Sequence, residues 1–309
     1  MPTPAILALG EPMIEFNQTE PGKPNYLQGF GGDTSNAIIA CARQGASCGY
    51  LTRLGDDEFG RAFLDLWQRE GVDTSGVGID AVAHTAVYFV THGEAGHSFS
   101  YLRRDSAASR MAQAHLVADL IRNARFLHVS GISQAISQSA RDAVAAAIAL
   151  ARSNGVKVSY DTNLRLKLWP IETAREVITA TIAVADYLLP SLEDLQAVSG
   201  LVAPDTILDW CFAHGATNVA LKCGRDGCIA ATPLQRMPIA GHKVNAVDAT
   251  GAGDCFDGAF LARLDAGDDL VAAARYANAA AALTTTGFGA VAPLPRREQV
   301  AAFLSRSGD

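Results

Sequence analysis

Short, largely apolar runs bounded by glycine or polar residues recur along most of the chain. The first lies at residues 5–9, and others lie at residues 47–53 and 156–161. Further runs of this kind occupy residues 124–130, 185–190 and 218–222. Runs of roughly four to eight residues without regular polar alternation are typical of strands that are buried on both faces. The pattern therefore predicts a sheet that is covered by helices on both sides.

Segments with helical periodicity separate these predicted strands. Residues 36–44, 57–70 and 137–153 are predicted as helices, and Gly45 and Gly71 follow the first two directly. Glycine just beyond the last periodic residue often ends a helix, because it adopts a left-handed conformation without strain. Alternation of strands with helices predicts an α/β fold with a mostly parallel central sheet.

Two inserts interrupt this alternation. The first, at about residues 11–32, is too long for an ordinary loop between a strand and the next helix. The second, at about residues 84–104, contains two strand-like stretches joined through residues 93–96, which is a hairpin signal. We expect the inserts to form a small β-sheet lid over the active site. Because no linker or internal repeat divides the chain, residues 1–309 are predicted to form a single domain.

Composition limits the functional classes. The chain has 309 residues, of which 49% are hydrophobic, and a formal net charge of −7. An acidic chain without a long basic run is a poor candidate for nucleic-acid binding. No apolar run reaches the roughly 18 residues that span a bilayer, and the first residues lack the basic start of a signal peptide. The six cysteines form no Cys-x-x-Cys pair, so we expect reduced thiols, no membrane partner and a cytoplasmic location.

The most informative segment spans residues 245–260, where a glycine-rich turn precedes a predicted helix. Gly251 and Gly253 would let the N–H groups of the first helical turn approach an anion closely. Those N–H groups and the helix dipole favour a phosphoryl group. Asp254 lies at the mouth of this turn, where a carboxylate can accept a proton from a substrate hydroxyl. Asp254 could instead only cap the helix, but the pair of glycines favours the anion site.

Two signatures then point to a family. The run from Asp248 to Asp254, Asp-Ala-Thr-Gly-Ala-Gly-Asp, resembles the C-terminal signature of the ribokinase-like (PfkB) carbohydrate kinases. The run from Gly31 to Ala37, continued through residues 51–60, resembles their N-terminal signature. The Gly-x4-Gly-Lys-Ser/Thr sequence of P-loop kinases does not occur in the chain. The resemblance covers essentially the whole chain.

This resemblance implies a ribokinase-like three-layer α/β sandwich and an ATP-dependent sugar kinase that needs Mg²⁺. It implies that Asp254 is the catalytic base and that the backbone of Gly251, Ala252 and Gly253 forms the anion hole with it. The residues that we expect around ATP are Asn163, Ser191, Lys222, Gly224, Gly227 and Asn278.

The segment Ser191-Leu-Glu193-Asp194 departs from the family pattern. The family often has Asn-x-x-Glu here, so Ser191 replaces the usual asparagine and could equally cap a helix. Glu193 remains a candidate for ordering the Mg²⁺ shell. Asp248 matches a residue near the monovalent-cation site of some members, which makes K⁺ a candidate cofactor.

Two arginines suggest that the sugar carries a carboxylate. Arg103 lies at the end of the predicted lid hairpin, and Arg165 follows a strand at the edge where open α/β sheets bind ligands. Arginine binds carboxylates bidentately and stays charged. Both surrounding segments resemble those of 2-keto-3-deoxygluconate kinases. The expected substrate contacts are Gly31, Gly32, Asp33, Asn36, Tyr88, Tyr101, Arg103 and Arg165.

The sequence thus predicts ATP-dependent phosphorylation of 2-keto-3-deoxygluconate at O6. A neutral-sugar kinase of the fructokinase or ribokinase type shares the catalytic motifs and differs only at the arginines. A nucleoside kinase and a non-catalytic sugar-binding regulator are further alternatives. Arg165 could instead pair with Asp161, and Tyr88 could only pack within the lid. Exposed lid strands often pair, so a homodimer through the lid is plausible.

Overall fold

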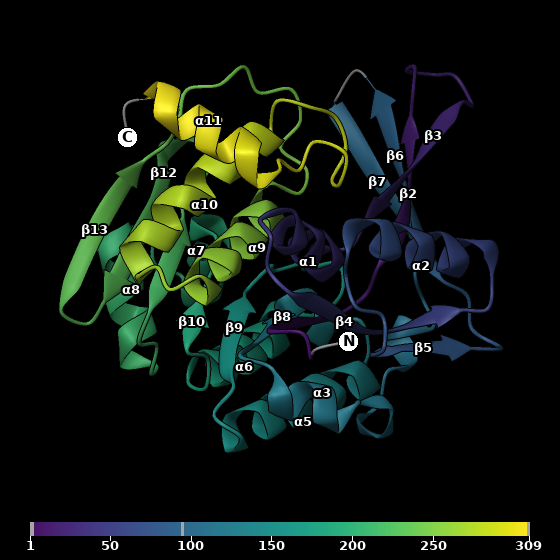
Figure 1. The fold of residues 1–309 in the computed structure, drawn as a ribbon, viewed down its shortest axis with the longest axis horizontal. Helices are drawn as coiled ribbons and strands as arrows, with labels where there is room; N and C mark the ends of the chain where they lie inside the picture. The colour runs from purple at the N-terminus through teal and green to yellow at the C-terminus, as the bar shows by residue number, and fades with distance from the viewer. Residues whose placement is uncertain (1–2, 94–95, 308–309) are drawn as a thin grey trace.

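A computed structural model describes residues 3–93 and 96–307 of the chain. Within these residues, nine strands form a central sheet in the order β13-β12-β11-β10-β9-β8-β1-β4-β5, and four form a smaller sheet in the order β3-β2-β6-β7. Figure 1 shows the smaller sheet standing out beside the main body. In the same residues, no helix is both long and apolar enough to cross a membrane.

The central sheet is mostly parallel. Its strands are β1 (Ile6–Leu9), β4 (Cys48–Gly55), β5 (Val77–Asp80), β8 (Phe126–Ser130), β9 (Lys157–Asp161), β10 (Tyr187–Leu188), β11 (Val219–Lys222), β12 (Gly227–Thr232) and β13 (Gln235–Ala240). Every pair from β5 across to β11 is parallel, whereas β12 and β13 add an antiparallel edge. The predicted α/β class is confirmed, and the antiparallel edge is a feature that the sequence analysis missed.

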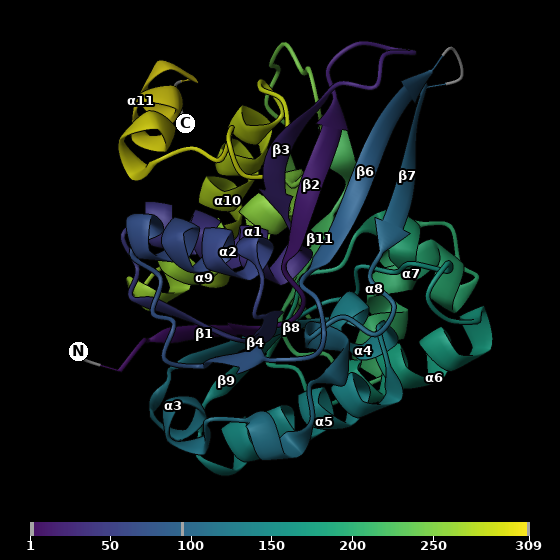
Figure 2. The ribbon, with the colours of Figure 1, turned by 90° about the vertical axis from the view of Figure 1, so that its right-hand side faces the viewer.

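Helices cover both faces of this sheet, which gives three layers (Figure 2). One layer holds α1 (Asp33–Arg43), α2 (Glu58–Glu70), α9 (Ala252–Asp265), α10 (Leu270–Thr284) and α11 (Arg297–Ser307). The opposite layer holds α3 (Ala118–Asn123), α4 (Gly131–Ala135), α5 (Gln138–Ser153), α6 (Ile171–Ile182), α7 (Leu192–Ser199) and α8 (Pro204–Ala213). Short 3₁₀ turns lie at Ala108–Arg110, Gln113–His115 and Gly224–Asp226.

Strand β1 shows why the sequence specifies this sandwich. Successive side chains of a strand point to opposite faces, and all four residues of β1 are buried. Ile6 and Ala8 pack in the core beneath α1 and α9, whereas Leu7 and Leu9 pack in the core beneath α5 and α6. An uninterrupted apolar run is therefore needed, because neither face of the strand meets water.

The smaller sheet confirms the predicted lid. It consists of β2 (Met13–Gln18), β3 (Tyr26–Gly31), β6 (Ala86–Gly93) and β7 (Gly96–Leu102), so both inserts contribute strands. The predicted hairpin turn includes Glu94 and Ala95, which lie outside the described residues. Gly31 ends β3 directly before the first helix, and this short connection places the lid beside the start of α1.

Most predicted boundaries differ from the structure by one or two residues, and two differ by more. The first helix begins at Asp33 rather than residue 36, because Gly32 takes a φ of 101° and turns the chain straight into α1. The strand predicted at 185–190 shrinks to Tyr187–Leu188. Pro190 follows closely and donates no backbone hydrogen bond, which explains the early end.

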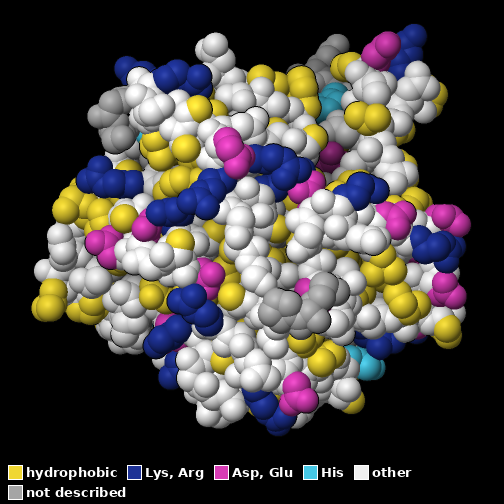
Figure 3. Space-filling model, viewed as in Figure 1, with side chains coloured by type: hydrophobic (Ala, Val, Ile, Leu, Met, Phe, Trp, Pro, Cys, Tyr) yellow, Lys and Arg dark blue, Asp and Glu magenta, His cyan; other side chains and the backbone are white. Residues whose placement is uncertain are grey.

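Basic and acidic side chains are interspersed on the face shown in Figure 3, and hydrophobic ones are scattered between them. Such mixing is typical of a solvated surface. The described cysteines are all free thiols, as the sequence analysis expected.

Helices α1 and α9 pack unusually close together. A Cβ atom added to Gly258 of α9 would lie only 2.0 Å from the carbonyl oxygen of Ala37 in α1. A side chain of any size is therefore excluded at this crossing. The contact sets the distance between the first turns of the two helices, which carry the candidate active-site residues.

We predict that Gly258→Ala destabilises the protein by about 1–3 kcal/mol, the usual range for overpacking. In an unconstrained helix the same change would stabilise the protein by about 1 kcal/mol. The sign of the change in unfolding free energy therefore distinguishes overpacking from helix propensity. Denaturant unfolding measures it. Ser153→Thr, which adds one methyl group at the exposed end of α5, is the control. A Gly258→Ala variant as stable as wild type would mean that α1 and α9 separate freely.

Candidate active site

Several of the predicted site residues lie at the carboxyl ends of the parallel strands. Asp161 ends β9 and Lys222 ends β11, and the first turns of α1 and α9 lie against the same edge. Open α/β sheets bind their ligands at this edge. The lid strands approach it from outside, since Gly31 of β3 leads into α1.

The first turn of α9 presents open hydrogen-bond donors. Gly251 caps the helix with a φ of 76°, and a Cβ atom there would lie 2.7 Å from the carbonyl oxygen of Ala290. The N–H of Ala252 donates to Ala249, but the N–H groups of Gly253 and Asp254 have no acceptor among the described residues. Two of the expected anion-hole donors are therefore free for an anion, and that of Ala252 is already used.

Asp254 is held by a residue from the other signature. The side-chain amide of Asn36 in α1 donates to Oδ2 of Asp254 over 2.8 Å. Burial and the nearby carboxylate of Asp33 raise the pKa of Asp254 to about 7. A carboxyl group with this pKa can accept a proton near neutral pH, as a general base must.

The first turn of α1 offers unpaired acceptors. Asp33 and Asn36 are both buried, and Oδ1 of each side chain has no hydrogen-bond partner among the described residues. Asn163 has a φ of 28° and donates its amide to Oδ2 of Asp33 over 3.3 Å. Burial raises the pKa of Asp33 as well. Unpaired buried acceptors are costly, and hydroxyl groups of a ligand would satisfy them.

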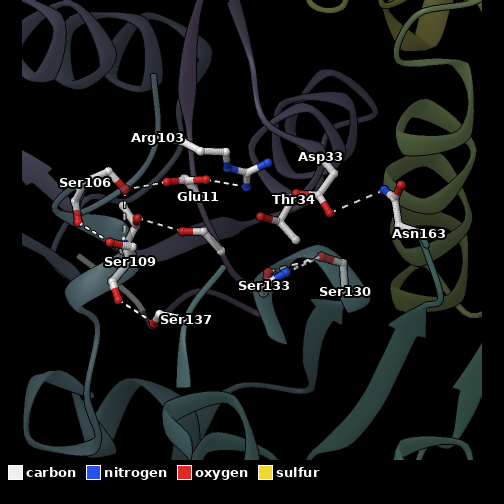
Figure 4. A network of polar contacts seen from close by, with 12 residues as sticks. Glu11, Asp33, Thr34, Arg103, Ser106, Ser109, Ser130, Ser133, Ser137 and Asn163 are labelled. Atoms are coloured by element: carbon white, nitrogen blue, oxygen red, sulfur yellow. Dashed lines mark hydrogen bonds and ion pairs between the residues drawn. The ribbon is translucent and has the colours of Figure 1, made fainter. Parts of the chain in front are cut away.

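Arg103 is already paired with a carboxylate of the protein. Its guanidinium forms an ion pair with Glu11, and the two side chains are 11% and 0% exposed. Figure 4 shows the guanidinium between Glu11 and the start of α1, where Asp33 turns toward Asn163. Ser106 donates a hydrogen bond to the other oxygen of Glu11. The positive charge that the sequence analysis assigned to a substrate carboxylate is thus largely neutralised.

Arg165 lies apart from this network. It is exposed and donates to the carbonyl oxygen of its neighbour Leu164 over 2.8 Å. Within residues 3–93 and 96–307 it forms no ion pair with Asp161. The two arginines therefore do not form one preassembled carboxylate clamp.

The lid tyrosines have different environments. The hydroxyl group of Tyr88 donates to Glu15 over 2.5 Å, and its ring fills the space where a side chain on Gly31 would lie. Tyr101 is 39% exposed and its ring lies 5.9 Å from that of Tyr88. Tyr88 thus packs within the lid, whereas Tyr101 keeps an accessible face.

Lys222 joins two buried carboxylates. Its Nζ lies 3.2 Å from Asp161 and 2.9 Å from Asp257. Burial opposes its charge, but the two aspartates outweigh that effect and hold the pKa of Lys222 above its ordinary value. Burial and the charge of Asp161 raise the pKa of Asp257. Asp257 was not among the site residues predicted from the sequence. Its position one turn after Asp254 on a mostly apolar helix could have indicated a functional role.

A cavity of about 620 Å³ opens between the loop before α9, the end of α10 and α11. Its lining residues are Lys243, Val244, Asn245, Val247, Leu283, Thr286 and Phe303. Asn278 of α10 does not line it but donates its amide to Ala240 at the end of β13 over 2.8 Å. Gly224 and Gly227, with φ of 59° and 100°, shape the turn between β11 and β12.

Ser191, Glu193 and Asp248 were predicted to bind ATP, Mg²⁺ and a monovalent cation, respectively. They lie in a loop or at the start of a helix. Ser191 caps α7 by accepting a hydrogen bond from the N–H of Asp194 over 3.0 Å. Glu193 is exposed on the first turn of that helix. Asp248 accepts from the N–H groups of Thr250 and Gly289, both over 2.9 Å, and so ties the loop before α9 to the loop after α10.

Comparison with known proteins decides the family. A sequence model described as "pfkB family carbohydrate kinase" matches residues 4–297. The chain belongs to the pfkB family of carbohydrate kinases.

Relatives of this pfkB-family chain include several fructokinases. Fructokinase-1 of rice (Oryza sativa subsp. japonica) is 35% identical over 96% of both chains. A fructokinase of Vibrio cholerae O395, solved with fructose, ADP and calcium, is 29% identical with a TM-score of 0.89 over 98% of this chain and 99% of that one. A ribokinase II-like protein of E. coli, solved with ATP and Mg²⁺, has a TM-score of 0.91 and 26% sequence identity. The match covers 98% of this chain and 99% of that one.

These findings confirm the predicted ribokinase-like fold and the prediction of an ATP-dependent carbohydrate kinase. The E. coli complex supports the prediction of ATP and Mg²⁺ as cofactors. The comparisons do not support the specificity for 2-keto-3-deoxygluconate, because the curated relatives are fructokinases.

We predict that Asp254→Asn stabilises this kinase at pH 8 and has a smaller effect at pH 5. The pKa of Asp254 rises from an ordinary 3.8 to about 7 in the folded protein. Its contribution to stability is therefore complete below about pH 4 and is lost as the pH rises through about 7. Asparagine is never charged and keeps an acceptor for Asn36. Thermal unfolding at both pH values measures the difference, and equal shifts at both would contradict the raised pKa.

Proposed function

We propose that this pfkB-family kinase transfers the γ-phosphoryl group of ATP to a primary hydroxyl group of a neutral ketohexose such as fructose. The observation that carries the proposal is the ion pair between Arg103 and buried Glu11. An arginine whose charge is already matched offers N–H donors for hydroxyl groups but little net attraction for a carboxylate.

The remaining polar groups of the site also suit a neutral polyol. Asp33, Asn36 and Asp254 all present oxygen acceptors, two of which have no partner among the described residues. Each hydroxyl group of a sugar can donate one hydrogen bond to such an acceptor. A substrate carboxylate would instead meet the like charges of Asp33 and Asp254, which costs free energy at short range.

The acid-sugar hypothesis requires a different arrangement. Arg165 would have to turn from solvent into the cleft, and Arg103 would have to share its charge between Glu11 and the substrate. The fructokinases among the relatives add weight to the neutral sugar, because they cover nearly the full chain at 35% and 34% identity.

The chemical step follows from the groups around α9. Asp254 takes the proton of the attacking hydroxyl group while that oxygen bonds to the γ-phosphorus. The bond between the γ-phosphorus and the bridging oxygen breaks, and ADP leaves. The open N–H groups of Gly253 and Asp254 stabilise charge on the phosphoryl oxygens. Bound Mg²⁺ would supply further charge neutralisation on the phosphates.

Other elements hold the two substrates around this centre. Gly224 and Gly227 in the turn after β11, and Asn278 on α10, are the candidates for contacts with the nucleotide. Tyr101 and the backbone of Gly31 and Gly32 cover the sugar from the lid. Closure of the lid would exclude water and limit wasteful hydrolysis of ATP.

Coupled measurement of ADP release with Mg²⁺ tests the substrate. We expect kcat/KM for fructose to exceed that for 2-keto-3-deoxygluconate, with ribose and a nucleoside weaker than fructose. Preference for the acid sugar would show that the arginines form a clamp despite Glu11. In that case Arg165→Ala would reduce the acid-sugar preference. No turnover of any of these compounds would reject a neutral ketohexose as the substrate.

A second prediction concerns Asp254→Ala. Loss of the general base should reduce kcat by about 10²–10⁴-fold while nucleotide binding is kept. Asp268→Ala is a suitable control, because Asp268 is paired with Arg263 at the far end of α9. Near-normal turnover by Asp254→Ala would contradict the assignment of the base.

A further inference from the structure

We infer that Lys222 contacts the transferred phosphoryl group and that buried Asp257 positions the ammonium group for this contact. The inference rests on the kinase chemistry proposed above, but it does not depend on which sugar is the acceptor.

The ammonium group lies beside the open donors of α9. A Cβ atom added to Gly253 would lie 3.7 Å from Nζ of Lys222, which is the one contact within 4 Å among the described residues outside the nearby backbone of α9 and the chain neighbours of Gly253. Gly253 carries one of the two free N–H groups of the first turn. An anion bound by that turn would therefore also meet the ammonium group.

The ammonium group has one donor to spare. A lysine carries three N–H bonds, and Lys222 uses its contacts with Asp161 and Asp257. Among the described residues, no third acceptor lies within hydrogen-bond distance of Nζ. The Lys222 side chain as a whole keeps 12% exposure.

The charges of the site favour an anion as the partner of this third N–H group of Lys222. The carboxyl groups of Asp161 and Asp257 flank Lys222, and Asp254 lies in the first turn of α9 beside them. Like charges at these distances oppose the approach of an anion. A cation next to the first turn of α9 offsets that repulsion where the γ-phosphoryl group must lie.

A purely structural role explains the arrangement less well. Replacing a buried ion pair by apolar residues is often neutral or stabilising, and one oxygen of Asp257 is buried without a partner. A buried oxygen without a partner costs stability, so stability alone does not explain the position of Asp257. Asp257 lies three residues after Asp254, so one face of α9 holds the base and the group that aims Lys222.

Lys222→Met tests the contact in the whole protein. We expect kcat to fall about 10- to 100-fold, the value of one charge-assisted hydrogen bond. Calorimetry without any sugar should show about tenfold weaker binding of the β,γ-imido analogue of ATP, and unchanged binding of AMP, which lacks the terminal phosphates. Lys157→Met is the matched control, because Lys157 pairs with Asp186 at the far end of β9.

Substitutions at Asp257 separate positioning from charge. Asp257→Asn keeps an oxygen that accepts from Nζ and should retain most of the activity, whereas Asp257→Ala should lower kcat toward that of Lys222→Met. If Lys222→Met does not fold, the double variant Lys222→Met/Asp257→Ala removes the cation together with one buried acid and allows the same binding comparison.

Three results would overturn the inference. Unchanged kcat and unchanged affinity for the ATP analogue would make Lys222 structural. Equal losses for the analogue and AMP would place its effect on the nucleoside part of the site. Full activity of Asp257→Ala would remove the positioning role. The comparison of nucleotides decides these points even if fructose is not a substrate.

Discussion

The close contact between α1 and α9 is the constraint on which the site depends. Gly258 lets the helices approach until only a hydrogen atom fits against the backbone of Ala37. Because of this contact, Asn36 reaches Asp254 across 218 residues of sequence. The two family signatures are therefore one structural unit, and neither would form an active centre without the other.

The site concentrates acidic groups that the rest of the molecule must hold in place. Burial of Asp33 and Asp254 raises the pKa of both, which means that their charged forms are less stable in the folded protein than in water. The two hydrophobic cores on either side of β1 offset the free-energy cost of burying these carboxyl groups. Reactive groups in a strained electrostatic environment are common at functional sites, where local rules of stability are broken.

Much of the fold could be predicted from short-range patterns. The apolar run of β1, the glycine stops and the double glycine before Asp254 each act within a few residues, and each prediction is confirmed as a structural element. The antiparallel edge β12–β13 was not predicted, because β13 mixes polar and apolar residues and contains a proline.

The electrostatic details of the site could not be predicted in the same way. The pairing of Arg103 with Glu11 joins the two separate inserts, and a sequence shows an arginine without showing its partner. The same holds for Asp257 of helix α9, whose role depends on Lys222 reaching it from the end of strand β11. Residue type and local spacing therefore suggested a charge for the substrate that the protein itself already supplies.

The Arg103–Glu11 pair has an evolutionary consequence. Under the proposed function, the charge preference of the sugar pocket depends on the buried side chain of Glu11, which no substrate needs to touch. Replacing that carboxylate by its amide would leave the shape of the pocket and every lining residue intact, yet free a full positive charge for an acidic ligand. If the proposed role of this pair holds, one hidden substitution would be enough to change the charge preference of this sugar pocket, and comparison of pocket-lining residues alone would not detect it.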